Sequence, residues 1–396
     1  MTDDPAVIYL DHAAATPPQP RSVEALRDAT VLFGNPSSPH SAGRRARAAL
    51  EDARERIIAL LGGRTSAPGR DRFVFTSGAT EANRLGILGT AGRRPGTVAI
   101  SPRDHGSVVT AAEELAAGGW SMTRLPPAAD GTWAATDEIS ARQGRVLVTA
   151  TLVCSQTGIR EDFRRLPRPT ADGRVLVHAD ATQAVAWDRI AFRDLPVTSL
   201  ALAAHKVGGP RGIGGLLVRG DVDVTPVMAG PQELGLRGGT ESVPLAVAFA
   251  VALEAAIDEQ RAVAARVASL RGRLEHGIAA AAGRHGFEAL IVGQEADRAP
   301  HIATIAVRGC DRQAVVMACD LAGVCLATGT ACASGSSEPA PAIQALPLPS
   351  WVPQAAFRAS LASTTTDREI DEAVRRINGV FRGFATAGLL GGDSAR

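Results

Sequence analysis

The sequence predicts an α/β fold in which a mostly parallel β-sheet is covered by helices on both faces. Along most of the chain, short apolar runs alternate with segments of helical periodicity. Most of these runs are continuously apolar, which is the pattern of strands that are buried on both faces. A chain of 396 residues, 45% of them hydrophobic, is long enough to form two domains.

The predicted elements follow one another in order along the chain. Residues 41–61 form a long amphipathic helix that ends at the glycine pair 62–63. The predicted strands comprise residues 72–76, 97–100, 121–125, 145–149, 174–177 and 199–203. The glycine-rich run 212–219 predicts an edge strand. Residues 241–281 predict a long helix that leads to a smaller C-terminal domain with a strand at 302–307.

Composition and charge exclude several classes of protein. The net charge of +1 gives no electric field that would attract nucleic acid or an acidic membrane surface. The first residues are acidic and lack the basic and apolar regions of a secretory signal. The longest uncharged apolar stretch, residues 242–253, is too short to span a bilayer. We therefore expect a soluble, cytoplasmic protein that binds neither nucleic acid directly nor a membrane.

Two polar side chains at the ends of neighbouring strands carry the first functional hypothesis. Lys206 follows the apolar run 199–203, and Asp180 ends the run that begins at residue 174. The carboxyl ends of strands in an open α/β sheet face the ligand crevice. A lysine amine can form a Schiff base with an aldehyde cofactor, and a carboxylate can keep the pyridine nitrogen of that cofactor protonated. The pair indicates pyridoxal 5′-phosphate (PLP); the alternative is a surface lysine and a structural aspartate.

Two further segments fit a phosphorylated cofactor at the same edge of the sheet. The small residues 77–80 join a predicted strand to a helix, and the N–H groups at such a helix N-terminus favour a phosphate. Thr80 adds a hydroxyl donor. His105 follows the strand 97–100 and therefore lies near the same crevice. Turns and loop histidines of this kind also occur in α/β proteins that bind no cofactor.

The cysteines divide into one exposed candidate and four inert ones. None of the five follows a C-x-x-C spacing, which argues against a zinc site and against structural disulfides. Cys332 lies in a loop of glycine, serine and other small residues that offers no apolar partner to its sulfur, which favours a reactive thiol. The other four lie in hydrophobic surroundings and are expected to be inert: Cys154, Cys310, Cys319 and Cys325.

Taken in this order, the motifs resemble the class V family of fold-type I PLP enzymes and, within it, the NifS/IscS-type cysteine desulfurases. The resemblance is carried by residues 9–17, 34–43, 75–81, 180–183, 205–212, 236–240, 328–332, 338–339 and 357–361. It implies a large PLP-binding domain at 17–257 with a mostly parallel seven-stranded sheet. It also implies a smaller α/β domain at 258–396 that carries the Cys332 loop, and an N-terminal segment, 1–16, that packs with the small domain.

The resemblance assigns a role to each residue around the cofactor ring. Lys206 would form the covalent link to PLP and later carry the α-proton of the substrate. Asp180 would pair with the pyridine nitrogen, and Gln183 would donate a hydrogen bond to the ring hydroxyl. His105 would stack on the ring and assist proton transfer.

It also assigns residues to the phosphate, the substrate and the sulfur. The phosphate would be held by Gly78, Ala79, Thr80 and His205, and by Thr240 from the second subunit of a homodimer. Arg358 would bind the carboxylate of L-cysteine, because a planar guanidinium matches a carboxylate with two hydrogen bonds. Ser155 would contact both cofactor and substrate, and Cys332 would accept the sulfur.

Four positions depart from the usual pattern of these desulfurases. Ser155 replaces an asparagine that helps to hold cofactor and substrate, and Ala203 replaces a phosphate-binding serine or threonine. Gly238 stands in place of a common serine, and Ala15 in place of a common threonine. A hydrogen bond to a charged group contributes about 1.5–3 kcal/mol. We therefore expect weaker retention of the cofactor unless another donor compensates.

The resulting prediction is a homodimeric, PLP-dependent cysteine desulfurase. It would convert L-cysteine to L-alanine and pass the sulfur, as a persulfide on Cys332, to an acceptor protein. Iron–sulfur assembly, tRNA thiolation, cofactor synthesis and DNA phosphorothioation are all compatible destinations. One alternative is another class V enzyme, such as a C–S lyase, selenocysteine lyase or aminotransferase, in which Cys332 is incidental. The other is a sulfur-transfer scaffold with little activity of its own, which only the changes at Ser155 and Ala203 favour.

Overall fold

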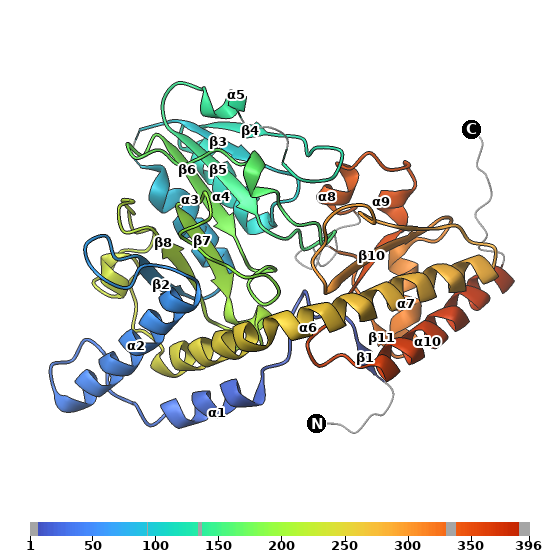
Figure 1. The fold of residues 1–396 in the computed structure, drawn as a ribbon, viewed down its shortest axis with the longest axis horizontal. Coiled ribbons are helices and arrows are strands. Elements are labelled where there is room, and N and C mark those ends of the chain that lie inside the picture. Colours follow the sequence, from blue (N-terminus) through green and yellow to red (C-terminus); the bar gives the residue numbers. More distant parts are fainter. Residues whose placement is uncertain (1–6, 93, 134–136, 330–337, 388–396) are drawn as a thin grey trace.

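A seven-stranded sheet forms the centre of the larger half of the molecule (Figure 1). The computed structural model describes residues 7–92, 94–133, 137–329 and 338–387. The strand order is β2-β8-β7-β6-β5-β3-β4, and β8 alone runs antiparallel to its two neighbours. The strands are β2 (Arg72–Thr76), β3 (Thr97–Ile100), β4 (Ser121–Arg124), β5 (Val146–Thr151), β6 (Val175–Asp180), β7 (Ser199–Ala203) and β8 (Gly214–Val218). The predicted fold class is confirmed.

Helices cover both faces of this sheet because successive strand residues point to opposite sides. On β5, Val148 packs in a core with α2 (Ser41–Leu60) and α6 (Val243–Arg284). Its neighbour Leu147 packs in a separate core with α3 (Ala79–Ala91) and α4 (Gly106–Ala117). Helix α1 (Pro20–Ala29) lies along α6 on the first face (Figure 1).

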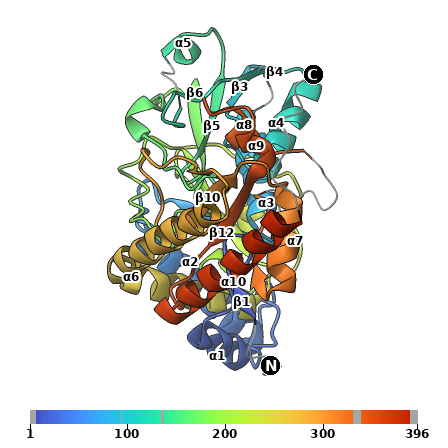
Figure 2. The same ribbon diagram turned by 90° about the vertical axis from the view of Figure 1, so that its right-hand side faces the viewer.

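The smaller half contains a three-stranded antiparallel sheet with order β12-β10-β9. Its strands and the paired strands β1 and β11 are β9 (Ala289–Ile291), β10 (Ile302–Val307), β12 (Ala356–Ser360), β1 (Ile8–Tyr9) and β11 (Val324–Cys325). Helices α7 (Arg312–Leu321) and α10 (Asp367–Thr386) share a second large core with this sheet (Figure 2). The remaining short elements are α5 (Asp137–Ser140), α8 (Pro341–Gln344), α9 (Val352–Ala355) and the 3₁₀ turns η1 (Phe163–Arg165), η2 (Ala204–Lys206) and η3 (Glu233–Gly235).

Two segments cross between the two halves. Helix α6 is 42 residues long; Phe249 in its first half belongs to the large core, and Ile278 in its second half belongs to the small one. The N-terminal segment crosses within a few residues, since Leu10 packs in the small core and Ala13 in the large one. These crossings bring the N-terminal segment to the junction of the two halves.

The glycine-rich strand β8 differs from its prediction, because it is an interior strand and not an edge. It pairs with β2 on one side and with β7 on the other. Glycine is required for this position: a Cβ on Gly215 would lie 2.0 Å from the ring of Phe73 on the neighbouring strand. A run of glycines is typical of an edge or a bulge, whereas here it admits a bulky ring from a strand distant in the sequence.

Strands β5 and β6 extend beyond their predicted ends into polar residues. Thr151 lies beyond the predicted end of β5 and Asp180 beyond that of β6, and both remain, with Thr149, in the ladder between the two strands. Their burial is tolerated because they are hydrogen-bonded; Thr149 and Thr151, for example, donate to the carboxylate of Asp104.

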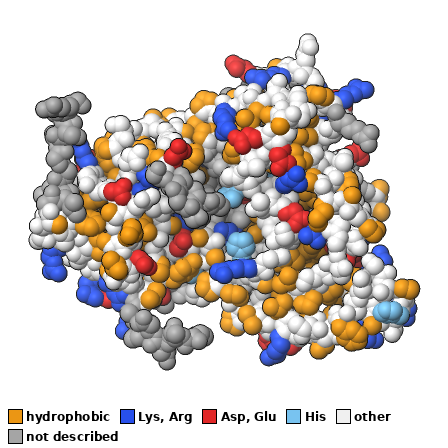
Figure 3. All heavy atoms as spheres, turned by 180° about the vertical axis from the view of Figure 1, so that it is seen from behind, with side chains coloured by type: hydrophobic (Ala, Val, Ile, Leu, Met, Phe, Trp, Pro, Cys, Tyr) orange, Lys and Arg blue, Asp and Glu red, His pale blue; other side chains and the backbone are white. Residues whose placement is uncertain are grey.

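Acidic and basic side chains are interspersed on the surface seen in Figure 3. No helix in the described parts of the chain is long and apolar enough to cross a membrane.

Candidate active site

The carboxyl ends of β6 and β7 bring Asp180 and Lys206 to one edge of the sheet. The two strands are parallel neighbours, with Asp180 opposite Ala201. Lys206 lies in the turn η2, directly after β7. Lys206 is also the only lysine in the sequence, whose other basic side chains are arginines and histidines. The one side-chain amine of the protein therefore lies where a sheet of this type binds its ligands.

Backbone carbonyls of the N-terminal segment connect Lys206 to Gln183. The Nζ atom of Lys206 donates to the carbonyl oxygens of Ala13 at 2.5 Å and Ala14 at 2.8 Å. The carbonyl oxygen of Ala13 also accepts from Nε2 of Gln183 at 2.8 Å. Because an amide nitrogen carries two hydrogens, one N–H of Gln183 remains for a ligand such as the PLP ring hydroxyl.

The carboxylate of Asp180 is held by two donors in a buried environment. Its Oδ1 accepts from the backbone N–H of Thr182 at 2.9 Å, and its Oδ2 accepts from Nδ2 of Asn83 at 2.9 Å. Asp180 is only 6% exposed and Asn83 is fully buried. The two donors fix the orientation of the carboxylate, which can accept a further hydrogen bond from a pyridine N–H.

Asn83 joins Asp180 to two histidines. Its Nδ2 also donates to Oγ of Ser107 at 3.0 Å, and Ser107 contacts Nδ1 of His105 at 2.8 Å. On its other side, Oδ1 of Asn83 lies 3.0 Å from Nε2 of His178. Because the amide oxygen can only accept, Nε2 of His178 carries a proton. The buried amide of Asn83 thus links Asp180 to His105. These are the residues predicted to pair with the pyridine nitrogen of PLP and to stack on its ring.

His178 is a buried, neutral base behind Asp180. Its Nδ1 lies 2.8 Å from Oγ of Ser199. Burial lowers the pKa of His178 to about 4, although the neighbouring charge of Asp180 acts in the opposite direction. The ring fits only because residue 86 is glycine, since a Cβ there would lie 2.3 Å from His178. The prediction missed Asn83 and His178; a histidine inside an otherwise apolar strand was the available signal.

The turn that precedes α3 has the features of a phosphate cradle. Gly78 is the N-cap of the helix, and the first helical hydrogen bond runs from the N–H of Ala82 to its carbonyl oxygen. The backbone N–H groups of Ala79 and Thr80 lie before that bond, so they have no partner within the helix and can face a phosphate. A Cβ on Gly78 would meet no atom within 4 Å, so there is open space above the turn. Thr80 is exposed on this turn.

His205 and Thr240 were also predicted to hold the phosphate. His205 precedes Lys206 in η2, and burial lowers its pKa to about 4, with further contributions from the positive charges of Lys206 and Arg211. Thr240 is exposed. Its loop is attached to the phosphate turn by an ion pair between Arg237 and Glu81 at 2.8 Å. Ala203 ends β7 with a methyl group, so its side chain offers no donor.

Arg358 lies buried between the two halves of the molecule. Its guanidinium donates to the carbonyl oxygen of Ser155 at 2.9 Å and to the carboxylate of Asp11 at 2.7 Å. The side chain of Arg358 is 3% exposed, and that of Asp11 is 20% exposed. The Nε atom of Arg358 has no hydrogen-bond partner in the described structure. Ser155 thus contacts Arg358 through its backbone, which the replacement of an asparagine by serine leaves intact.

The predicted sulfur acceptor Cys332 lies outside the described residues. Of the other cysteines, Cys154, Cys310 and Cys319 are buried and Cys325 is partly buried. Burial raises the pKa of Cys310 to about 11 and that of Cys319 to about 12. Burial and the charge of Asp320 also raise the pKa of Cys325. These shifts keep the three thiols protonated near neutral pH, which suppresses their reactivity.

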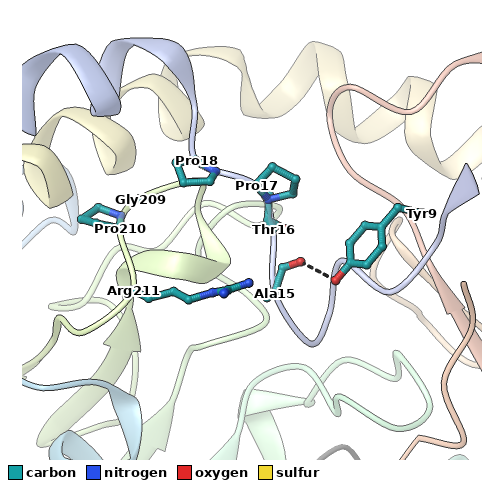
Figure 4. Close-up of a pocket in the computed structure, with 8 residues that line it drawn as sticks. All are labelled: Tyr9, Ala15, Thr16, Pro17, Pro18, Gly209, Pro210 and Arg211. Carbon is teal, nitrogen blue, oxygen red and sulfur yellow. Dashed lines mark hydrogen bonds between the residues drawn. The ribbon is translucent and has the colours of Figure 1, made fainter. Parts of the chain in front are cut away.

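A surface hollow of about 590 Å³ lies next to the site (Figure 4). It is lined by residues within a few positions of Ala14 and Lys206 in the chain, together with Tyr9: Ala15, Thr16, Pro17, Pro18, Gly209, Pro210 and Arg211. The hydroxyl of Tyr9 donates to the carbonyl oxygen of Ala15 at 3.0 Å, and Arg211 extends toward Ala15. Lys206 is not among the lining residues, because it points to the Ala13 and Ala14 carbonyls.

The described residues fit PLP. They supply an amine, a carboxylate held by two donors, an amide with a spare N–H and an open helix N-terminus for the phosphate. The arrangement can therefore carry an amino acid on an aldehyde cofactor and bind its carboxylate through Arg358.

Comparison with known proteins gives a consistent family. The model of the aminotransferase class-V family matches residues 8–373. A cysteine desulfurase from Bradyrhizobium diazoefficiens is 33% identical over 385 residues, or 96% of each chain. An IscS-like cysteine desulfurase from Mycobacterium tuberculosis is 31% identical over 98% of this chain and 100% of its own. The solved structure of a NifS-like protein superposes with a TM-score of 0.83 at 25% identity, covering 94% of this chain and 99% of the other.

We predict that Asn83→Ala destabilises the protein by about 2–4 kcal/mol, because it leaves the buried N–H of His178 without an acceptor and removes the donor to Oδ2 of Asp180. Urea unfolding measures the change. Arg84→Ala, on the exposed side of the same helix, is the control; it removes only a surface ion pair with Glu114 and should cost less than about 1 kcal/mol. Equal effects of the two changes would contradict the role of Asn83.

We also predict that His178 makes the protein less stable in mild acid. Its pKa is about 4 in the folded protein and 6.5 in the unfolded chain, so between these pH values only the unfolded chain binds the proton. Lowering the pH from 7 to 4 should therefore reduce the free energy of unfolding through His178 by about 3 kcal/mol.

Denaturant unfolding of the wild type and of His178→Gln at both pH values tests this. The variant should lose less stability on acidification than the wild type. His276→Gln, at an exposed position, is the control and should follow the wild type. Parallel losses in the wild type and in His178→Gln would show that His178 does not titrate as described.

Proposed function

Because the chain belongs to the class-V aminotransferase family and, within it, to the cysteine desulfurases, we propose that it is a PLP-dependent enzyme that converts L-cysteine to L-alanine. One observation carries the proposal: the only lysine of the chain lies at the same edge of the sheet as Asp180 and shares the carbonyl oxygen of Ala13 with Gln183. PLP, when bound, supplies an electron sink for an amino acid that is attached to its aldehyde carbon. We further propose that the enzyme acts as a cytoplasmic homodimer, in which Thr240 serves the partner's phosphate site.

In the proposed reaction, Lys206 holds the cofactor and then moves the α-proton of the substrate. The carbonyl oxygens of Ala13 and Ala14 hold Nζ of Lys206 before the cofactor is attached. Asp180 keeps the pyridine nitrogen protonated, and two donors hold its carboxylate in place. His105 accepts the N–H of Ser107 at Nδ1, which leaves the proton of its neutral ring on Nε2 for transfer.

Arg358 binds the carboxylate of L-cysteine in this proposal. Its bond to Asp11 supports this role, because a guanidinium that accommodates one carboxylate can accommodate another. The substrate carboxylate would displace Asp11, whose side chain is less buried than that of Arg358. The Nε atom of Arg358 lacks a partner in the described structure, and it would donate a second hydrogen bond to the substrate carboxylate.

Sulfur transfer is proposed to use Cys332. Its thiolate attacks the sulfur of the substrate, and the bond between that sulfur and the substrate β-carbon breaks. The electron pair of the broken bond stays on carbon, which takes up a proton. One enzyme thiol and one L-cysteine thus give one persulfide and one L-alanine. The raised pKa values of the described thiols Cys310, Cys319 and Cys325 support the choice of Cys332 by contrast. A sulfur-acceptor protein then receives the persulfide sulfur.

We predict that borohydride reduction attaches PLP to the wild-type protein and not to Lys206→Ala. The reason is that the chain contains no second lysine. Mass spectrometry of peptides from the reduced protein measures the attachment. Lys206→Arg is the matched control, since it keeps the positive charge but cannot form the link, and it should also remain unlabelled. Labelling of either variant would place the reactive amine at the chain terminus.

We predict that Cys332→Ser still binds PLP but forms neither a persulfide nor catalytic amounts of alanine, because a hydroxyl is a poor nucleophile toward sulfur at neutral pH. Absorbance reports the bound cofactor, and product analysis with L-cysteine reports turnover. Cys325→Ser is the matched control; this partly buried thiol has a raised pKa, and its replacement should preserve activity. Normal turnover by Cys332→Ser would remove Cys332 from the reaction.

A further inference from the structure

A buried hydrogen bond joins the two halves of the molecule at Gln183. Nε2 of His301 lies 3.1 Å from Oε1 of Gln183. Gln183 follows strand β6 of the large sheet, whereas His301 directly precedes strand β10 of the small sheet. Both side chains are nearly inaccessible, with Gln183 9% exposed and His301 2% exposed. The contact is therefore made away from solvent, where an unpaired polar group is costly.

The donors and acceptors around Gln183 can be arranged in only one way. The carbonyl oxygen of Ala13 can only accept, so the nitrogen of the Gln183 amide must face it at 2.8 Å. The amide oxygen then faces His301 and must accept as well. Nε2 of His301 therefore carries a proton and donates it to Gln183. Ala13 and His301 together determine the orientation of the amide.

The ring of His301 is itself held in place. It stacks on Trp187 with ring centroids 4.6 Å apart and planes 10° from parallel. The backbone carbonyl oxygen of His301 accepts the N–H of Leu361 at 2.8 Å, next to the end of β12. Burial, with the positive charge of Arg358, lowers the pKa of His301 well below its usual value, so the ring is neutral. The ring thus offers a single fixed donor to Gln183.

We propose that His301 is a positioning residue that orients the Gln183 amide so that its second N–H faces the ring hydroxyl of PLP. This inference rests on the proposed function, because it requires PLP as the ligand of Gln183. His301 acts through Gln183 and does not itself touch the cofactor. Cofactor binding in the large half thereby depends on a residue of the small half, the half that also supplies Arg358.

Titration of the apoenzyme with PLP tests the inference without measuring turnover. His301→Phe keeps an aromatic ring against Trp187 but removes the donor, and it should raise the dissociation constant of PLP about five- to tenfold. His301→Gln keeps an N–H donor near the position of Nε2 without the ring, and its dissociation constant should stay within about twofold of the wild type. The opposite ranking of these two variants would mean that stacking, and not the hydrogen bond, is what matters.

A double-mutant cycle identifies the route of the effect. In the Gln183→Ala background, His301→Phe should cause no further loss of PLP affinity, because the residue through which it acts is gone. Losses that multiply in the double variant would overturn the proposal. The matched control is His285→Phe, which removes a similar 3.2 Å contact between a histidine Nε2 and the amide oxygen of Asn378 and should leave PLP affinity unchanged. A wild-type protein that binds no PLP would instead refute the proposed function itself.

Discussion

The carbonyl oxygen of Ala13 is the acceptor on which the arrangement of the site depends. It accepts from Lys206 and from Gln183, and the N–H of the same residue donates to Oγ of Ser360 on β12 at 2.8 Å. A single residue of the N-terminal segment thus contacts the end of β7, the turn after β6 and the small sheet. Because a carbonyl can only accept, it also determines which end of the Gln183 amide faces the cofactor site. The crossing of the N-terminal segment between the two cores makes this possible.

Behind the carboxylate of Asp180, the protein places a layer of neutral hydrogen-bonding groups. Asn83, His178 and Ser199 form a buried chain, and each donor in it meets an acceptor. A cation at His178 would compete with the cofactor for Asp180, but burial keeps that ring neutral. The layer therefore orients the carboxylate of Asp180 without placing a histidine cation beside it. The ring of His178 requires a glycine at position 86, because a Cβ there would collide with it. Glycine within a helix is destabilising, so helix α3 is weakened at this position.

The placement of Asp180 and Lys206 could be predicted because both follow apolar runs, and parallel strands bring such ends to one edge. The supporting residues could not, since Asn83, His178 and His301 are single polar residues within buried segments and no periodicity identifies their partners. The pairing of Arg358 with Asp11 spans most of the chain and leaves no local pattern. Strand β8 was assigned to an edge for a related reason: its glycines match the ring of Phe73, which is distant in the sequence.

An N-terminal segment, two strand ends and a residue of the small sheet together form the proposed site for an amino acid on PLP. In the proposed reaction, this site breaks the bond between carbon and sulfur in L-cysteine by transferring the sulfur to an enzyme thiol. The product that the purified protein forms from L-cysteine in the presence of PLP distinguishes this reaction from its alternatives. We expect alanine, in an amount equal to the sulfur released or retained as persulfide. Pyruvate and ammonia in place of alanine would show that the enzyme is a lyase and not a desulfurase.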